Sequence, residues 1–331
     1  MSVLLRVEDE PPAARLDSFR YALDSTIAPY DLQVEAEGPL RDTSIHAGRV
    51  GPVGVTRVVG PGRFECRRTP TLIRRSDPEL LKIDVQLRGG TAYAQGGREV
   101  ALAPGDFTLV DLSRPSRVRN AGAGQEVVAV VFARDALPLR HDELARLTAV
   151  RVPGREGLGA PIVALARHLA RRLGDRGATD GTRLAGALMD LLTVAFAERL
   201  DRVGAVSPAT RRRALTTSVQ SFIDRQLADP RLSPRTIAAA HHISPRLLCR
   251  LFEEQGTSVA RWIRERRLER CRRDLLDPAL SDLPVSSIAF GWGFADAAHF
   301  SRVFRQAYGH PPAEYRRLAH SCASGQGSCA G

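Results

Sequence analysis

Two segments in the C-terminal third of this chain follow one residue pattern, and this repeat constrains the fold more than any other feature. Each segment opens with an Ile-Ala pair, at 237–238 and at 288–289. A residue suited to a tight turn follows, then an apolar residue, a helix-capping residue and an apolar-x-Arg-apolar-Phe run. The equivalent positions are His242 and Gly293 for the turn, Ile243 and Phe294 for the apolar residue, Ser244 and Asp296 for the cap, and 248–252 and 300–304 for the run.

The pattern predicts two helices joined by a tight turn, in two copies. The alanine lets the paired helices cross closely, and the turn position favours the left-handed conformation that glycine adopts without strain. Apolar side chains after the turn anchor the second helix, which leaves its other face exposed. The first turns of such a face fit a DNA major groove, which is about 12 Å wide. Many enzymes contain one such pattern, whereas two copies inside a basic region favour nucleic-acid binding.

The positive charge of the chain is concentrated around this repeat. The formal net charge is +11, and residues 208–320 hold 19 arginines against 11 acidic residues, which gives +8 of that total. Lys82 is the only lysine, so nearly all of the positive charge is arginine. A basic surplus in one region is typical of proteins that bind polyanions, although coding bias also enriches arginine.

The segment between the two copies, residues 258–276, predicts one connecting helix. A rigid connection would let two reading helices enter successive major grooves, about 34 Å apart on one face of DNA. The arginines of this helix either form a solvated basic face or contact phosphates. They are Arg261, Arg264, Arg266 and Arg267.

These features resemble the DNA-binding domain of the AraC/XylS family of bacterial transcription regulators. The resemblance covers Thr216 to Leu318, about a third of the chain. The second copy matches the family signature at Ile288-Ala289, Gly293-Phe294, 300–304, Gly309, Pro311 or Pro312, and Tyr315-Arg316, and the first copy matches at Leu232, 237–238, Ser244, Leu248, Arg250, Phe252 and Gly256. The family usually has glycine where this chain has His242, so we expect a looser first turn.

The resemblance implies seven positions for contact with DNA bases. They are Arg246, Cys249 and Arg250 in the first reading helix, and Ala297, Ala298, Ser301 and Arg302 in the second. Arginine can bind guanine with two hydrogen bonds, worth about 1–3 kcal/mol of discrimination, whereas alanine contacts only a thymine methyl group. We therefore expect the first helix to supply most of the specificity and the second to hold the register. Intradomain salt bridges for Arg250 and Arg302, and a spacer role for Cys249, stay open as alternatives.

The N-terminal part of the chain predicts short β-strands arranged as a sandwich or small barrel. From about Thr43 to Phe132, β-branched or alternating segments are separated by glycine- and proline-rich turns. From about Gly159 to Leu200 the period becomes helical, with a break at GDRGATDG. This helical hairpin is either plain core or an oligomer seam, and we favour a part in dimer contacts.

The predicted fold class is therefore α+β with two domains. As the family resemblance implies, residues 1–150 are expected to form a cupin-like β-barrel with an effector-binding or regulatory role, and 151–207 to form a helical linker. Residues 208–320 form an all-α DNA-binding domain with two helix-turn-helix units, and 321–331 form a disordered tail.

Part of the strand region also resembles the cupin-like sensing domain that family members often carry, through 87–90, 95–99, Leu102, 104–106 and 114–115. Metal-dependent cupin enzymes use clustered His and Glu ligands, but His46 is the only histidine between Thr43 and Phe132. We therefore expect no catalytic residue, no metal and no cofactor. The effector-binding residues stay unknown, because a one-residue slip in register reverses every side chain. Arg88 either pairs with an acidic effector or lies at the surface.

The resemblance implies a sequence-specific DNA-binding transcription regulator that responds to an effector and activates a nearby operon. Its expected partners are double-stranded promoter DNA, RNA polymerase, a small-molecule effector and a second copy of the chain. We expect no membrane association and a cytoplasmic location, because no apolar run reaches about 18 residues. Free thiols are expected for the five cysteines. Two alternatives remain: a metal-independent cupin-type enzyme with an accessory DNA-binding domain, and a ligand-independent dimeric regulator.

Overall fold

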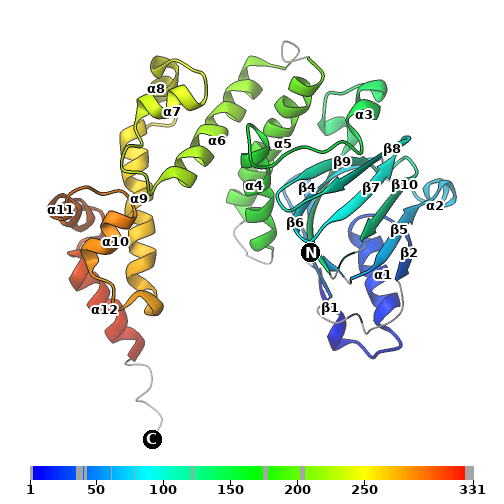
Figure 1. Ribbon diagram of the computed structural model, residues 1–331, viewed down its shortest axis with the longest axis horizontal. Coiled ribbons are helices and arrows are strands. Elements are labelled where there is room, and N and C mark those ends of the chain that lie inside the picture. Colours follow the sequence, from blue (N-terminus) through cyan, green and yellow to red (C-terminus); the bar gives the residue numbers. More distant parts are fainter. Residues whose placement is uncertain are drawn as a thin grey trace, which may run out of the picture. The chain divides into compact units, whose positions relative to one another are not determined.

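The computed structural model describes residues 3–34, 40, 43–60, 62–77, 79–120, 122, 124–173, 178–201 and 206–324 (Figure 1). The chain divides into two compact units, Met1–Ser218 and Val219–Gly331. The division lies inside helix α6 (Pro208–Gln226). The domain boundary predicted at 207/208 lies at the start of the same helix.

The N-terminal unit is built on two antiparallel β-sheets. One has the strand order β1-β3-β4-β11-β6-β9 and the other has β2-β5-β10-β7-β8. The strands are β1 (Val3–Arg6), β2 (Asp31–Val34), β3 (Ser44–Val50), β4 (Val53–Gly60), β5 (Phe64–Arg68), β6 (Leu80–Arg88), β7 (Thr91–Gln95), β8 (Arg98–Leu102), β9 (Phe107–Asp111), β10 (Ser116–Asn120) and β11 (Gln125–Ala133). Strands β3 to β11 lie in the region predicted to form strands, from about Thr43 to Phe132, whereas β1 and β2 precede it.

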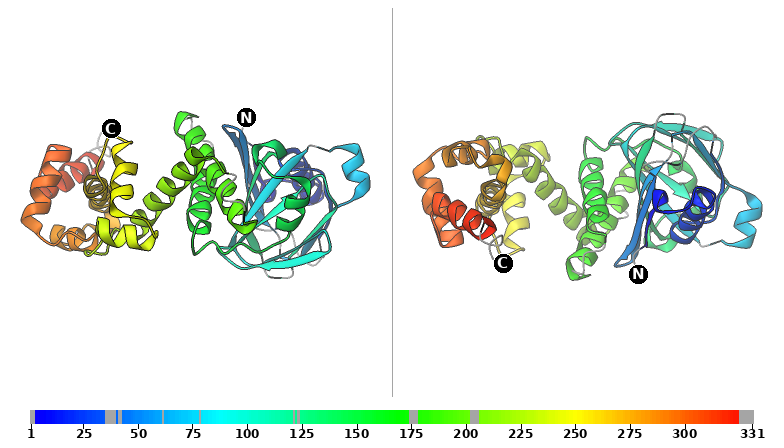
Figure 2. Two further views of the ribbon diagram at one scale, coloured as in Figure 1. Left: turned by 90° about the horizontal axis from the view of Figure 1, so that it is seen from above. Right: turned by 90° about the horizontal axis from the view of Figure 1, so that it is seen from below.

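The two sheets face each other across a shared interior, around which the strands curve (Figure 2). Val58 and Val131 enter this interior from the first sheet, and Phe64 and Tyr93 enter it from the second. Helix α1 (Arg15–Thr26) adds Phe19 to the same core. The arrangement confirms the predicted β-rich N-terminal domain.

The predicted helical hairpin is present as α4 (Gly159–Arg171) and α5 (Ala178–Arg199), but it is not a linker. Ile162 of α4 and Leu188 of α5 share a core with Ile83 and Val130 of the first sheet. The hairpin covers the face of that sheet which points away from the shared interior, so both faces of the sheet are buried. The predicted linker 151–207 therefore belongs to the β-domain, because its apolar stripes shield this second face from water.

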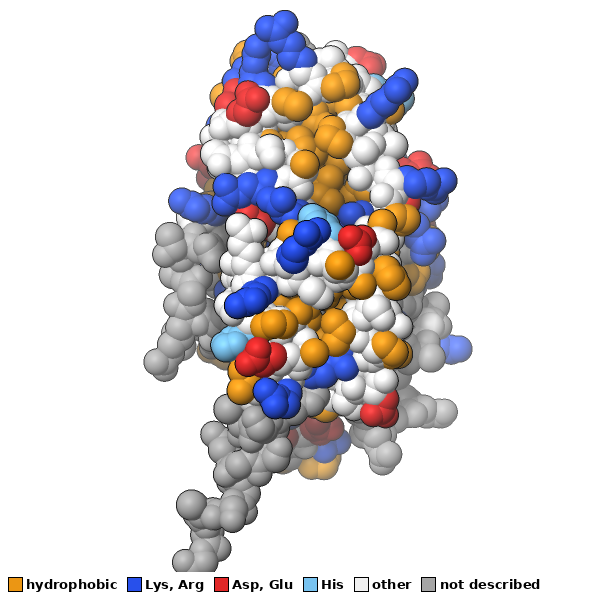
Figure 3. All heavy atoms as spheres, turned by 90° about the vertical axis from the view of Figure 1, so that its left-hand side faces the viewer, with side chains coloured by type: hydrophobic (Ala, Val, Ile, Leu, Met, Phe, Trp, Pro, Cys, Tyr) orange, Lys and Arg blue, Asp and Glu red, His pale blue; other side chains and the backbone are white. Residues whose placement is uncertain are grey.

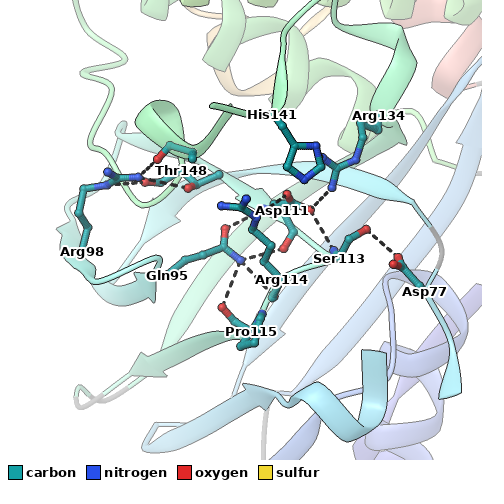
Figure 4. Close-up of polar contacts among 11 residues, drawn as sticks. Asp77, Gln95, Arg98, Asp111, Ser113, Arg114, Pro115, Arg134, His141 and Thr148 are labelled. Carbon is teal, nitrogen blue, oxygen red and sulfur yellow. Dashed lines mark hydrogen bonds and ion pairs between the residues drawn. The ribbon is translucent and has the colours of Figure 1, made fainter. Parts of the chain in front are cut away.

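Polar contacts around the buried Asp111, at the end of β9, join the two sheets at one end of the unit (Figure 4). The backbone N–H of Asp111 donates to Gln95 Oε1 at 2.9 Å, and Gln95 Nε2 donates to the carbonyl of Asp111 at 2.8 Å. The Asp111 carboxylate accepts from Arg134 at 2.7 Å. Arg98 donates to the carbonyl of Thr148, just after helix α3 (His141–Leu147).

A short helix α2 (Pro70–Arg75) follows β5.

The C-terminal unit is all-α, as predicted. After α6 it consists of α7 (Pro234–Ala240), α8 (Pro245–Glu253), α9 (Val259–Leu276), α10 (Val285–Gly291), α11 (Ala297–Tyr308) and α12 (Pro312–Ser324). The disordered tail predicted for 321–331 is wrong for its first four residues. Helix α12 continues through Ser324 because the sequence holds no glycine or proline between Pro312 and Gly325. Residues 325–331 lie outside the described residues. No helix in the described ranges is both long and apolar enough to cross a membrane.

Candidate nucleic-acid interface

The first helix-turn-helix unit consists of α7 and α8, and both helices begin at a serine cap. Ser233 accepts a hydrogen bond from the backbone N–H of Thr236 at 3.3 Å, and Ser244 accepts one from Leu247 at 3.1 Å. A proline follows each cap at the first helical position, where its missing N–H leaves no hydrogen bond unmade. The caps therefore fix where both helices start, as the sequence predicts for Ser244.

The turns of the two units close with equivalent hydrogen bonds. In the first, His242 N–H donates to the carbonyl of Ala239 at 3.1 Å, and Ile243 N–H donates to that of Ala238 at 3.0 Å. In the second, the N–H groups of Gly293 and Phe294 donate to the carbonyls of Phe290 and Ala289 at 3.0 and 3.1 Å. The prediction of a looser first turn is wrong, because His242 adopts the left-handed conformation with φ of 52° and its side chain is exposed.

Gly293 is held in the second turn by space as well as by conformation. Its φ is 78°, and a Cβ atom there would lie 2.7 Å from Arg267 Nη2 and 2.9 Å from the carbonyl oxygen of Leu227. Arg267 itself donates to the carbonyls of Leu227 and Asp229 at 2.9 and 2.7 Å. The connecting helix α9, the end of α6 and the second turn therefore meet at this glycine.

Helix α8 buries one side and exposes the other. Leu248, Leu251 and Phe252 are at most 1% exposed, which anchors the helix on the core. Arg246, Cys249 and Arg250 all lie exposed on the remaining surface. No ion pair or hydrogen bond joins either arginine side chain to another described residue. The structure thus brings the three residues predicted for the first reading helix to one surface and gives no intradomain salt bridge to Arg250.

Helix α11 is anchored in the same way by Phe300 and Phe304, which are fully buried. Asp296 caps it by accepting a hydrogen bond from Ala298 N–H at 2.9 Å. Of the residues predicted for contact, Ala298 and Arg302 are exposed, and Ala297 and Ser301 are partly exposed. Arg302 has no ion pair within the described part of the chain.

Arg305 on α11 is a further exposed cation that the sequence analysis did not single out. It follows Arg302 by three residues, so the two side chains emerge on neighbouring turns of one helix face. This helical spacing was the available signal, but the family positions alone do not include it.

The connecting helix is present as α9, and it contributes side chains to the cores of both helix-turn-helix units. Trp262 meets Phe252 of α8 with ring centroids 5.9 Å apart, and Leu275 shares the second core with Phe300 and Phe304. Aromatic rings reinforce this second core, since Phe304 lies 4.7 Å from Tyr308 between centroids. One rigid element thus holds α8 and α11 within the C-terminal unit.

The four arginines considered on α9 divide by their contacts. Arg266 forms a two-pronged ion pair with Asp224, with both nitrogen–oxygen distances at 2.8 Å, and Arg267 is held by backbone carbonyls. Arg261 pairs with Glu265 at 2.7 Å on the exposed surface. Arg264 is exposed and lacks an ion pair among the described side chains. The predicted phosphate contact therefore fits Arg264 best, because Arg266 and Arg267 already serve the fold.

Figure 3 shows a face of the C-terminal unit, on the side where α11 lies in Figure 1. Basic side chains are spread along this face among apolar and neutral ones, and acidic side chains are fewer. Such a distribution suits a polyanion that contacts an extended surface rather than one pocket.

In the described part of the chain, no group of three or more His, Cys, Asp or Glu side chains lies close enough together to hold a metal ion. In the cluster of Figure 4, the Ser113 hydroxyl donates to Asp77 at 2.6 Å, and His141 faces Arg134. The partner of the Ser113 hydroxyl is therefore Asp77 and not His141. Nucleophilic catalysis would need a base such as histidine within hydrogen-bond reach of the hydroxyl. Arg88 lies exposed at the surface, and Cys66, Cys249 and Cys271 are free thiols.

Known families and proteins match both units. A model of a helix-turn-helix domain matches residues 237–318, and a model of an AraC-binding-like domain matches residues 19–196. The transcriptional activator NphR of Rhodococcus sp. is 31% identical over 252 residues, which cover 76% of this chain and 73% of that protein. The arabinose operon regulatory protein of Escherichia coli (strain K12) is 31% identical over 239 residues, covering 71% and 79%.

Among solved structures, the crystal structure of the AraC-like transcriptional activator CuxR aligns with 81% of this chain and 94% of its own, at 20% identity and a TM-score of 0.49. The AraC-binding-like match spans more than half of the chain, and the similarity to NphR covers 76% of it at 31% identity. The chain therefore belongs to the AraC family of DNA-binding transcription regulators.

Proposed function

We propose that this regulator activates transcription by placing α8 and α11 in successive major grooves of promoter DNA. The observation that carries the proposal is the exposed surface of α8. There Arg246 and Arg250 are fixed at their Cα atoms by a buried helix side, while their guanidinium groups keep all donors available to a ligand. This combination suits two-pronged hydrogen bonding to guanine O6 and N7.

Helix α11 has a different task in this proposal. Its small residues Ala297 and Ala298 let the helix approach the bases closely, and Ser301 adds one hydroxyl. Arg302 and Arg305 supply charge for phosphates on the groove edge. The second helix-turn-helix unit therefore holds the register of the protein on the DNA, and the first supplies most of the base discrimination.

The remaining partners follow from the family. NphR is named a transcriptional activator, which supports activation and hence contact with RNA polymerase. The AraC-binding-like match supports a small-molecule effector in the N-terminal unit. We further infer a homodimer, a cytoplasmic location and no enzymatic activity.

Selection of genomic fragments by the purified full-length chain tests the proposal. The fragments should share a motif with two parts about one helical turn apart. Affinity for that motif should exceed the affinity for scrambled DNA by about 10³-fold or more, and should fall steeply with salt. A reporter gene behind the motif should be transcribed more when the chain is present. Equal affinity for the motif and scrambled DNA would overturn sequence-specific recognition.

A further inference from the structure

A cavity of about 60 Å³ lies in the interior of the N-terminal unit, between the two sheets and α1. Its walls are mostly apolar and come from α1 and from both sheets. The apolar residues that line it are Phe19, Leu23, Ile27, Val58, Phe64, Val118, Val127 and Ala129. For comparison, an apolar cavity of about 150 Å³ in another protein holds a benzene molecule.

A buried ion pair borders this cavity. Lys82 Nζ donates to Asp84 Oδ2 at 2.7 Å, and the two side chains are only 6% and 3% exposed. Lys82 is the only lysine in a chain with 48 basic residues. An apolar pair of similar size would often stabilise the fold equally well or better, because burying two charges costs much of what their attraction returns. Stability alone therefore does not account for Lys82 and Asp84 at these positions.

Two buried polar atoms line the same cavity without a hydrogen bond of ordinary length and angle to a described residue. They are the Tyr30 hydroxyl, with Lys82 as its polar neighbour, and Asp84 Oδ1, whose carboxylate has Tyr93 as a neighbour. Buried polar groups nearly always have partners in native proteins, so two such atoms in the wall of one cavity point to a bound molecule that satisfies both.

The protonation of the cavity is set by burial. Burial raises the pKa of Tyr30 and Tyr93, so both phenols remain protonated at neutral pH and can donate. Burial also raises the pKa of the Cys66 thiol to about 12, which leaves it without thiolate character. The cavity therefore offers hydrogen bonds rather than a nucleophile.

We propose that the cavity binds a small uncharged alcohol or phenol, which is the effector of this regulator. The ligand hydroxyl donates to Asp84 Oδ1 and accepts from the Tyr30 hydroxyl, and the apolar body of the ligand packs on the walls. Asp84 would repel an anion and Lys82 would repel a cation. A hydrocarbon would leave both polar atoms without a hydrogen bond. The inference rests on the proposed function, because it names the chemistry to which the regulator responds.

A ligand of seven or eight heavy atoms needs a larger cavity, since about 150 Å³ holds benzene, and we place the movement that enlarges it in α1. Phe19 and Leu23 of α1 line it, and Asp24 of the same helix accepts a hydrogen bond from the Tyr30 N–H at 3.1 Å. A shift of α1 is therefore transmitted to the residue that holds the ligand. Ligand binding and α1 position are coupled through Tyr30 in this way.

Calorimetry on the purified full-length chain with four probes of matched shape tests the proposal. The probes are benzyl alcohol, benzoate, benzylamine and toluene, with phenol as a second hydroxyl compound. We expect benzyl alcohol or phenol to bind at least tenfold more tightly than the other three. Tyr30→Phe should weaken that binding about five- to tenfold through loss of one hydrogen bond. Tyr21→Phe, at an exposed position of α1, should leave it unchanged.

A second variant keeps the test clear if single changes disturb the fold. Lys82→Met combined with Asp84→Leu replaces the ion pair by apolar side chains and should remain folded. This variant should bind toluene as well as it binds benzyl alcohol. Equal binding of benzoate and benzyl alcohol by the natural chain, or no binding of either hydroxyl compound, would overturn the proposal.

DNA binding by the same preparation separates the two levels of inference. Specific DNA binding without alcohol binding would overturn only the effector chemistry and would favour a regulator that acts without such a ligand. Alcohol binding without specific DNA binding would support the cavity and overturn the proposed function.

Discussion

His242 and Gly293 hold the same left-handed backbone conformation at equivalent turns, with φ of 52° and 78°. The left-handed conformation costs a residue with a Cβ atom roughly 1–2 kcal/mol, and glycine avoids that cost. His242→Gly should therefore stabilise the C-terminal unit by about 0.5–1 kcal/mol, after the larger entropy of glycine in the unfolded chain is subtracted. Chemical denaturation would measure the change, and a loss of stability would show that the His242 side chain contributes a contact of its own.

Gly293→Ala should destabilise the same unit by at least about 2 kcal/mol, because strain and collision act together. Gly309→Ala is a matched control: its φ is 84°, but nothing lies within 4 Å of the added Cβ. The control variant should lose only about 1 kcal/mol of stability, from the strained backbone conformation alone. Equal losses at the two positions would mean that Arg267 and Leu227 move aside freely.

Arg246→Ala and Arg250→Ala should each weaken binding to the selected DNA site by about 1–3 kcal/mol and relax its sequence preference. Ala297→Ser should have a smaller effect, and Arg171→Ala on α4 of the other unit should have none. Fluorescence anisotropy with the selected and a scrambled duplex would measure both affinities. If the two duplexes lose affinity equally, these arginines contact phosphates only.

The cysteines should differ sharply in reactivity. Iodoacetamide at pH 8 should modify the exposed Cys249 and spare Cys66 and Cys271, since burial raises the pKa of both thiols to about 12. Peptide mass spectrometry would follow each site. The selected DNA should protect Cys249 and scrambled DNA should protect it less, whereas unchanged labelling would place α8 away from the duplex.

Stability of the C-terminal unit should fall as the pH drops below about 6.5 through the titration of His241. Burial lowers the pKa of this imidazole, helped by the charge of Arg225, and its ring packs edge-on against Phe222. A folded-state pKa below the unfolded value means that stability is fully present above the unfolded pKa and is lost as the pH falls. His241→Gln should flatten the decline between pH 7.5 and 5.5 in denaturation experiments. Parallel curves for the two proteins would assign the decline to other groups.

The sequence predicts the C-terminal unit well because its signals are local. Caps such as Ser244 and Asp296, the turn at Gly293 and the anchors Phe252 and Phe304 all act within one helix pair. The partner of a longer apolar helix is not local information. The stripe of α4 and α5 shows that they bury a face, but nothing in it specifies a β-sheet as the partner.

The cavity residues could not be predicted from the sequence, for a related reason. In β6, Ile83 faces the core under α4 and α5, while Lys82 and Asp84 face the interior between the sheets. A strand with both faces buried breaks the rule that charged alternate positions point to water. The alternation of β6 would therefore have placed Lys82 and Asp84 on the outside.

Helix α9 sends Trp262 to one helix-turn-helix core and Leu275 to the other. Each inserted or deleted residue between them would rotate the two cores against each other by about 100° and shift them by about 1.5 Å. Length changes in this stretch should therefore be rejected by selection, while base-contacting side chains are free to change. The DNA sites of related regulators would then differ in the base pairs within their two half-sites. The distance between the half-sites would stay the same.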